Sequence, residues 1–398
     1  MTETQQPTET TPGALNLATI LQRMLAVSDK VSDLIFSPGR PPQIELVGKL
    51  QPVEIPGLDK LTPAQTAGIA KLIIGTHEEA AQSLEKFGST DLSFGVPGLC
   101  RFRVNIFKQR STNAIVMRVI PTRPPRFEEL NLPPQLRDVV ELKNGIVLVT
   151  GPTGSGKSST LAAIIDIINE TKYYHIVTIE DPIEFLHNHK NSTIHQRELH
   201  SDTPNFALAL RAALRQAPKV ILVGEMRDRE TMEVAMEAAE TGHLVLSTLH
   251  TIDAAKTVER IIGVFPKNEE QIIRTRLAQS FRYIVSQRLL PRADGSGRMA
   301  AIEILKATSR TREYIERGES EGKSLMDAMD QGELEGMQTF DGEIEKMIRA
   351  GVVSKEDGIA YASNYGNLLL RLGDLGGGGS GAKPKAEPEV GSMLDMIE

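Results

Sequence analysis

The sequence predicts an α/β protein, in which a mostly parallel sheet covered by helices follows a smaller α+β domain. One observation is the stretch Gly145–Thr160, where a short β-branched apolar run leads into a glycine-rich loop and then an apolar helix. A second is the alternation of strand-like and helix-like segments after residue 126. A third is the proline-rich run PTRPPR at 121–126, which indicates a stiff linker and hence a domain boundary.

The first domain is expected to span residues 14–122, after a polar N-terminal tail, 1–13, that we predict to be disordered. A helix is expected over 15–27, and a second begins after the cap Thr62 with Pro63 and ends at Gly75. Strands are expected at 34–37, 43–47, 91–95, 99–108 and 113–120. In the strand 99–108 one face carries Phe102, Val104 and Ile106, and the other carries Arg101, Arg103 and Asn105.

The second domain is expected over residues 123–375. Its strands are predicted at 146–150, 175–180, 219–224, 243–249 and 298–305. Its helices are predicted at 158–169, 204–216, 229–241 and 268–289, the second capped by Thr203 with Pro204 first. Residues 376–398 begin with GGGGSG and are expected to be a flexible tail.

Composition limits the functional classes. The single cysteine, Cys100, excludes an intrachain disulfide and a cysteine-based zinc site, and it suits a reducing cytosol. The sequence has no run of 18 apolar residues and no basic-then-apolar leader, so we expect a cytoplasmic protein. A net charge of −7 argues against broad nucleic-acid binding, and no nucleic-acid partner is expected.

The glycine-rich loop matches G-x-x-x-x-G-K-[ST], the pattern of a phosphate-binding loop. Glycines let successive backbone N–H groups surround phosphates, and the following helix N-terminus adds positive potential. Lys157 is expected to reach the β- and γ-phosphates, and the Ser158 hydroxyl to take a place on Mg²⁺. We therefore predict ATP binding by Gly151, Pro152, Thr153, Gly154, Ser155, Gly156, Lys157, Ser158 and Ser159.

Two acidic clusters follow strands of this domain. Glu180, Asp181 and Glu184 come after the apolar run 175–179, and Glu225 follows the run 220–223. Because ligands bind at the carboxyl ends of parallel strands, we expect Glu225 to hold Mg²⁺, partly through water. Spacing alone leaves either Glu184 or Glu225 as the base that activates water.

Histidines and arginines supply further candidates. His243 and His250 bracket an apolar strand, where they could sense the γ-phosphate, contact a neighbouring subunit or make ordinary hydrogen bonds; seven residues apart, they are poorly placed to share a metal. Arg101 and Arg103 form either a solvated face or a source of charge for the transferring phosphate. Residues 256–292 hold eight Lys or Arg against three Glu, which fits a pore lining, an acidic partner, a subunit interface or a solvated helix.

Taken together, these motifs resemble the hexameric secretion ATPases, and within them the PilT/PilU-type retraction motors of type IV pili. The resemblance covers about residues 15–372. Its matching segments are GPTGSGKS (151–158), TIEDPIEF (178–185), QRE (196–198), GEMRD (224–228), AETGHLVLSTLHT (239–251) and GMQTFD (336–341).

This resemblance implies a PAS-like domain followed by a RecA-like ATPase domain, assembled as a homohexamer that hydrolyses ATP with Mg²⁺. It places the catalytic glutamate at Glu184, the Walker B carboxylate at Glu225, arginine fingers at Arg101 and Arg103, and the histidine box at His243 and His250. It also implies a site of action on the cytoplasmic side of the inner membrane, on a pilus platform protein, in some cases beside a second retraction ATPase.

Departures from the family pattern leave alternatives open. Extension and type II secretion relatives usually carry a four-cysteine insertion, which a chain with only Cys100 lacks, so retraction is favoured. The segment 309–317 (SRTREYIER) is closer to the PilU subtype, which fits an accessory subunit, and Lys219 stands where relatives commonly have Asp. A RecA-type nucleic-acid translocase is disfavoured by the charge and by the 4% of aromatic residues.

Overall fold

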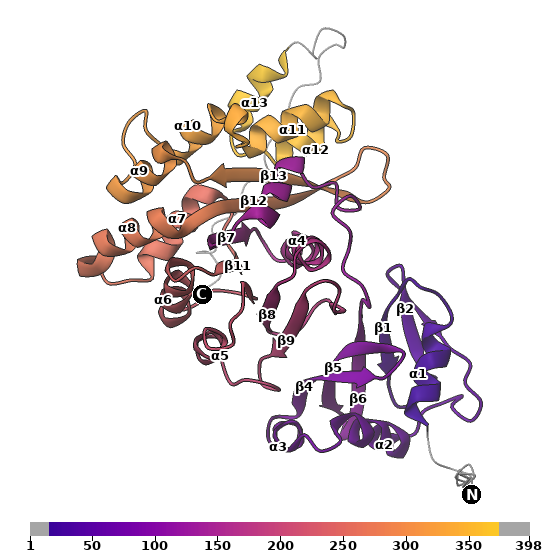
Figure 1. Cartoon of the computed structure of the whole chain (residues 1–398). Helices are drawn as coiled ribbons and strands as arrows, with labels where there is room; N and C mark the ends of the chain where they lie inside the picture. The colour runs from indigo at the N-terminus through magenta and orange to yellow at the C-terminus, as the bar shows by residue number, and fades with distance from the viewer. Residues whose placement is uncertain (1–15, 374–398) are drawn as a thin grey trace, which may run out of the picture.

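The computed structural model describes residues 16–373, so the predicted tails 1–13 and 376–398 lie outside the described residues. Two sheets organise the chain (Figure 1). The first has six antiparallel strands in the order β3-β2-β1-β6-β5-β4. The second has seven strands in the order β13-β12-β7-β11-β10-β8-β9.

The N-terminal sheet packs on helices over one apolar core. Its elements are α1 (Leu17–Leu25), β1 (Val31–Phe36), β2 (Gln43–Leu46), β3 (Lys49–Pro52), α2 (Pro63–Ile74), α3 (Glu78–Phe87), β4 (Ser89–Val96), β5 (Cys100–Gln109) and β6 (Thr112–Ile120). The predicted start of α2 is confirmed, since Thr62 and Gln65 cap it reciprocally. In β5 the side chains of Phe102, Val104 and Ile106 are buried, as their alternation predicted.

The second sheet is parallel apart from its edge strand β13, and an apolar cluster covers each of its faces. Its strands are β7 (Gly145–Thr150), β8 (His175–Glu180), β9 (Thr193–Glu198), β10 (Val220–Val223), β11 (Leu244–Leu249), β12 (Phe281–Pro291) and β13 (Arg298–Lys306). Its helices are α4 (Lys157–Thr171), α5 (Phe206–Ala213), α6 (Arg229–Glu240), α7 (Ala254–Gly263) and α8 (Glu270–Ser280). The mostly parallel sheet with helices on both faces is therefore confirmed.

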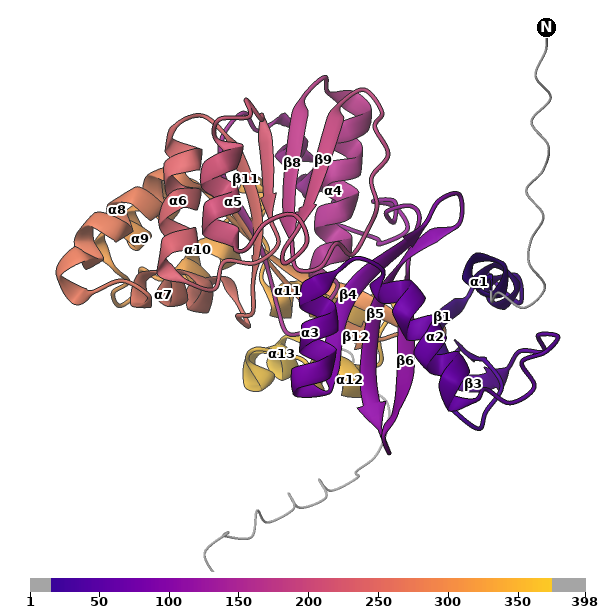
Figure 2. The ribbon, with the colours of Figure 1, turned by 90° about the horizontal axis from the view of Figure 1, so that it is seen from below.

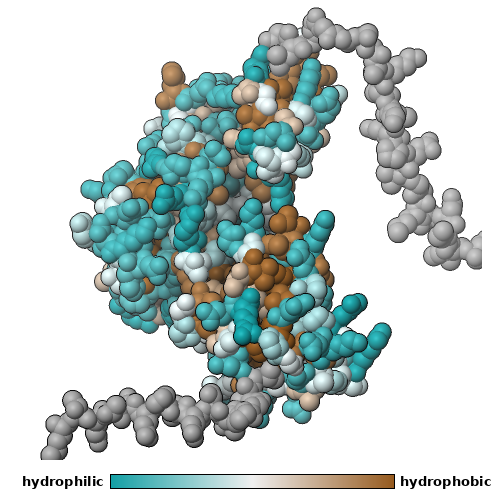
Figure 3. Space-filling view, turned by 90° about the vertical axis from the view of Figure 1, so that its right-hand side faces the viewer, coloured by the Kyte–Doolittle hydropathy of each residue, from teal (hydrophilic) through white to brown (hydrophobic). Residues whose placement is uncertain are grey.

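Small helices follow β13 within the described residues. They are α9 (Ser309–Arg317), α10 (Leu325–Asp330), α11 (Phe340–Arg349), α12 (Lys355–Ala360) and α13 (Tyr365–Arg371). Short 3₁₀ helices lie at Pro134–Glu141, before β7, at Lys267–Glu269, before α8, and at Glu333–Glu335, between α10 and α11. The space-filling view shows apolar side chains on both the N-terminal sheet unit and the C-terminal helices, within a largely hydrophilic face (Figure 3). Within residues 16–373, the structure contains no helix that is both long and apolar enough to span a membrane.

Two predicted helices differ from the structure. The helix expected over 268–289 is wrong in its second half, because the chain leaves α8 at Ser280 and enters β12 at Phe281. Strand β12 fills the place between β7 and β13, and this non-local pairing outweighs the helical pattern. Helix α5 begins at Phe206 and is capped by Asn205, not Thr203, because the Asn205 side chain accepts the N–H of Leu208.

Four elements were not predicted at all: β3, α3, β9 and α7. Among them, β9 matters most for the site, because it is the edge strand beside β8 and lies next to the N-terminal sheet unit (Figure 2). Residues of both units line a cavity of about 560 Å³ at this junction.

Candidate functional site

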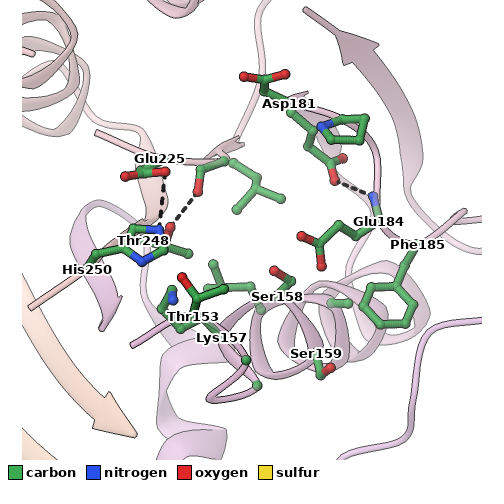
Figure 4. A pocket seen from close by; sticks show the side chains of 18 of the residues that line it. Thr153, Lys157, Ser158, Ser159, Asp181, Glu184, Phe185, Glu225, Thr248 and His250 are labelled. Carbon is green, nitrogen blue, oxygen red and sulfur yellow. Dashed lines mark hydrogen bonds and ion pairs between the residues drawn. The ribbon is translucent and has the colours of Figure 1, made fainter. Parts of the chain in front are cut away.

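A cavity of about 680 Å³ lies at the carboxyl ends of the central strands, against the glycine-rich loop. Figure 4 shows Glu184 and Glu225 on different sides of this cavity, with Lys157 and Ser158 near its base at the start of α4. Arg103, from β5 of the N-terminal sheet, also lines it. These five residues come from four separate stretches of sequence.

The loop between β7 and α4 requires glycine at Gly151. This residue has a φ of +145°, and a Cβ atom built there would lie 2.5 Å from the carbonyl oxygen of Gln287. The Lys157 ammonium group donates hydrogen bonds to the carbonyl oxygens of Gly151 (2.9 Å) and Pro152 (3.0 Å). Burial lowers the pKa of Lys157, while Glu225 and Glu184 act in the opposite direction. A buried cation beside the cavity is suited to an anionic ligand.

Six of the nine residues predicted to bind ATP line the cavity: Thr153, Gly154, Gly156, Lys157, Ser158 and Ser159. Gly151, Pro152 and Ser155 are not among its lining residues. Ser155 is buried, and its hydroxyl has no hydrogen-bond partner within the described chain. These three residues shape the loop behind the part that faces the cavity.

Glu184 is held by its backbone, which leaves its carboxylate exposed to the cavity. Its N–H donates to Oε2 of Glu180 at 3.4 Å. Glu180 is buried, and its Oε1 accepts from the Thr178 hydroxyl (2.6 Å) and the Gln196 amide (3.2 Å). Burial raises the pKa of Glu180 to about 7, although these hydrogen bonds act to lower it.

Glu225 follows β10, as predicted, and its carboxylate is mostly buried beside the cavity. Its Oε2 lies 2.8 Å from Nη2 of Arg227 and 3.4 Å from Nε2 of His250. The pairing with Glu225 raises the pKa of Arg227. Thr248, one strand away, also faces the cavity while its hydroxyl donates to the Gly224 carbonyl (2.7 Å).

In each predicted pair, of arginines and of histidines, one side chain lines the cavity and the other does not. Arg103 lines the cavity, whereas Arg101 pairs at 3.0 Å with Glu198 at the end of β9. His250 lines the cavity, whereas His243 lies at the other end of β11 with its Nδ1 2.9 Å from the Ala238 carbonyl oxygen. The two histidines do not meet, in agreement with their spacing.

The donor set of the cavity fits magnesium better than zinc. No group of three His, Cys, Asp or Glu side chains among residues 16–373 is arranged to hold a metal ion. Magnesium needs fewer protein ligands, since it keeps several waters and binds through one or two side chains plus phosphates. The Ser158 hydroxyl and the Glu225 carboxylate, which both line the cavity, offer oxygen atoms of the kind that magnesium binds.

Sequence reasoning missed the side chains that support this cavity. Gln196 and Glu198 were recognised only as part of a motif, and Arg227 only as part of GEMRD. Gln196 donates to the carbonyl oxygen of Phe185 (2.9 Å) and accepts the N–H of His187 (2.9 Å), and Glu198 accepts the N–H of Ile183 (3.0 Å). Gln196 and Glu198 lie two residues apart on one face of β9, and because that strand was not predicted, their shared orientation was not recognised.

Comparison with known proteins gives the family. Residues 89–326 match the model of the type II/IV secretion system protein family. The chain belongs to this family. The matched region runs from β4 through the cavity-lining segments and into α10. It therefore contains every cavity-lining residue named above.

Relatives match over nearly the whole chain. The "Type IV pilus retractation ATPase PilT" of Pseudomonas aeruginosa is 44% identical over 340 residues, which cover 85% of this chain and 96% of that protein. The "Type IV pilus ATPase PilU" of the same organism is 38% identical over 349 residues, covering 87% of this chain and 89% of that protein. Both relatives are named as type IV pilus ATPases.

A solved structure supports the fold of this secretion-family chain. The crystal structure of the pilus retraction motor PilT with bound ADP matches with a TM-score of 0.80 and 41% sequence identity. The match covers 90% of this chain and 100% of the PilT chain. The predicted α/β fold class and the predicted family are therefore confirmed, and membership implies ATP hydrolysis.

Proposed function

We propose that this chain is a Mg²⁺-dependent ATPase motor that drives type IV pilus retraction by pilin disassembly. The observation that carries the proposal is the cavity in which Lys157, two carboxylates and Arg103 converge. The similarity to PilT, which covers 96% of that protein's length, supports retraction of the pilus as the direction of movement. We also propose a domain division at the linker 121–126, with a PAS-like unit over 14–122 and a RecA-like ATPase unit over 123–375.

Each cavity residue then has a role in phosphoryl transfer. The loop N–H groups and Lys157 bind the β- and γ-phosphates of ATP. Ser158, and Glu225 through water, would hold a magnesium ion, which would neutralise phosphate charge. Glu184 takes a proton from the attacking water, because its carboxylate faces the cavity while Glu225 is occupied by Arg227 and His250. Arg103 supplies positive charge from the N-terminal unit.

The remaining predicted roles depend on assembly. We propose a homohexamer that works at the cytoplasmic face of the inner membrane on a pilus platform protein. Apolar side chains such as Leu370 and Tyr365 on α13 and Phe87 on α3 are exposed in the single chain, which supports burial between copies. In such a ring His243, which does not line the cavity of its own chain, can meet groups from a neighbouring subunit.

An accessory subunit is the second candidate. The similarity to PilU and the PilU-like segment 309–317 favour it. Under this alternative the chain binds nucleotide but needs a second retraction ATPase to do work. An extension or type II secretion motor is less favoured, because Cys100 is the only cysteine.

The cellular test is removal of the gene from a piliated host. Cells without the chain are expected to accumulate surface pili and to lose twitching motility, because assembly continues while disassembly stops. Normal twitching would contradict the main motor and the retraction role together. Loss of twitching that a second retraction ATPase restores when overproduced would favour the accessory subunit.

A further inference from the structure

Glu198, the last residue of β9, links two parts of the molecule through one oxygen atom. Its side chain is buried, and Oε2 accepts both the backbone N–H of Ile183 (3.0 Å) and Nη2 of Arg101 (3.0 Å). Ile183 immediately precedes Glu184, whereas Arg101 belongs to β5 of the N-terminal sheet. The same carboxylate oxygen therefore touches the loop of the proposed base and the other structural unit.

The loop that carries Glu184 is fixed mainly from β9. Gln196, two residues before Glu198 and so on the same face of the strand, bonds to the backbone of Phe185 and His187. Glu198 bonds to the backbone of Ile183 on the other side of Glu184. These two side chains thus bond to the backbone on both sides of Glu184, at Ile183 and at Phe185. A shift of Gln196 or Glu198 therefore moves the proposed base.

The contact with Arg101 is what makes Glu198 sensitive to the N-terminal unit. Arg101 is partly buried, with 27% of its side chain exposed against 5% for Glu198, and its Nε has no hydrogen-bond partner within residues 16–373. A buried carboxylate that loses its cationic partner is strongly disfavoured, because its desolvation is no longer offset. Movement of β5 away from β9 therefore leaves Glu198 with a strong drive to rearrange.

We propose that Glu198 is a positioning residue that couples the seating of the N-terminal unit to the placement of Glu184. This inference rests on the proposed function, since it takes Glu184 as the base. Arg101, in this arrangement, acts by holding Glu198, while Arg103 faces the nucleotide cavity. Hydrolysis is then fast only in the subunit whose N-terminal unit is seated against β9.

The test is a double-mutant cycle on the full chain with Arg101→Gln, Glu198→Gln and the double variant. Glu198→Gln retains an oxygen for the Ile183 N–H and removes the charge that Arg101 pairs with. Each single change is expected to lower kcat roughly 10-fold with KM for ATP nearly unchanged, because the phosphate-binding loop is untouched. The double variant is expected to be no slower than the singles, since both changes break one interaction.

A readout independent of turnover is hydrogen exchange of the 181–187 segment. Arg101→Gln and Glu198→Gln are each expected to speed deuterium uptake there. Arg118→Gln is the matched control, because Arg118 also makes a 3.0 Å ion pair, with Asp33, but wholly within the N-terminal sheet unit. It is expected to change neither kcat nor exchange in 181–187.

The outcomes separate this inference from the function on which it rests. If the wild type hydrolyses ATP but the two single effects multiply in the double variant, Arg101 and Glu198 act independently and the coupling is wrong. Unchanged exchange in 181–187 for Arg101→Gln would also overturn it, and would assign Arg101 to direct phosphate contact. A wild type that does not hydrolyse ATP would overturn the proposed function instead.

Discussion

Nε2 of His250 lies 3.4 Å from Oε2 of Glu225, and this contact joins the ends of two neighbouring parallel strands. Glu225 follows β10 and His250 follows β11, so both side chains reach the same edge of the sheet. The contact gives the predicted histidine box a definite geometry: only one of its two histidines reaches the cavity.

Replacement of the two histidines is therefore expected to have unequal effects. His250→Ala removes a partner of Glu225 beside the cavity and should lower kcat for ATP hydrolysis by roughly 10-fold or more. His243→Ala is the matched control, and the isolated subunit should bind ATP as well as the wild type does. Titration with a fluorescent ATP analogue and steady-state hydrolysis measure both quantities. An equal loss of kcat in His250→Ala and His243→Ala would contradict this prediction, because it would show that contact with the cavity does not determine the importance of the histidine.

A methyl group at Gly151 is expected to abolish nucleotide binding. Its Cβ would lie 2.5 Å from the Gln287 carbonyl oxygen and 2.6 Å from the Ser155 hydroxyl, at a φ that L-residues rarely adopt. Gly263→Ala at the end of α7 is the control, since a Cβ there meets nothing within 4 Å. Gly151→Ala should bind the ATP analogue at least 100-fold more weakly, a loss of about 2.7 kcal/mol. Wild-type affinity in Gly151→Ala would contradict the loop geometry.

The rate of hydrolysis is expected to rise with pH through about 7, where Glu180 ionises in the folded protein. Below that pH the protonated carboxyl accepts the Glu184 N–H less well, so the base is held less firmly. Because the ionised fraction of Glu180 falls as the pH drops below about 7, kcat should fall over the same range. Glu180→Gln should be slow at every pH and should lack this step. A step of the same size in Glu180→Gln would assign it to another group.

Glu303 provides a separate pH effect on stability. It is buried, and burial raises its pKa from 4.5 to about 7, although its Oε1 accepts the N–H of Ala254 at 2.8 Å. Between these pH values the unfolded chain is ionised while the folded chain is protonated, so its contribution to stability falls as pH rises and levels off above about 7. The midpoint temperature of Glu303→Gln, relative to wild type, should therefore be higher at pH 8 than at pH 5. An equal difference at both pH values would contradict the assignment.

Local sequence patterns were sufficient for most of the architecture. The phosphate-binding loop, the strands that flank it and the start of α2 depend on short-range chemistry such as glycine conformation and capping, so they could be read directly. The predicted helix over 268–289 failed because this stretch contains no glycine or proline that would mark the end of α8 at Ser280. Only the pairing of β12 with β7 and β13 marks that boundary, and such pairing is non-local.

The site shows the same division. The positions of Glu184 and Glu225 at strand ends followed from the rule for parallel sheets. The pairing of Arg101 with Glu198 joins residues 97 positions apart and depends on how two units meet, so no local pattern indicated it. The separation of Arg101 from Arg103 follows from it, although both lie on one polar face of β5.

The most direct test of the central claim is steady-state ATP hydrolysis by the wild type, Glu184→Gln and Glu225→Gln, with nucleotide binding measured in parallel. Glu184→Gln is expected to bind ATP normally and to lose roughly 100-fold or more in kcat, because a general base contributes about that much. Glu225→Gln is expected to require more Mg²⁺ for half-maximal activity. Wild-type turnover in Glu184→Gln, with activity lost in Glu225→Gln at every Mg²⁺ concentration, would contradict the account and give the base to Glu225.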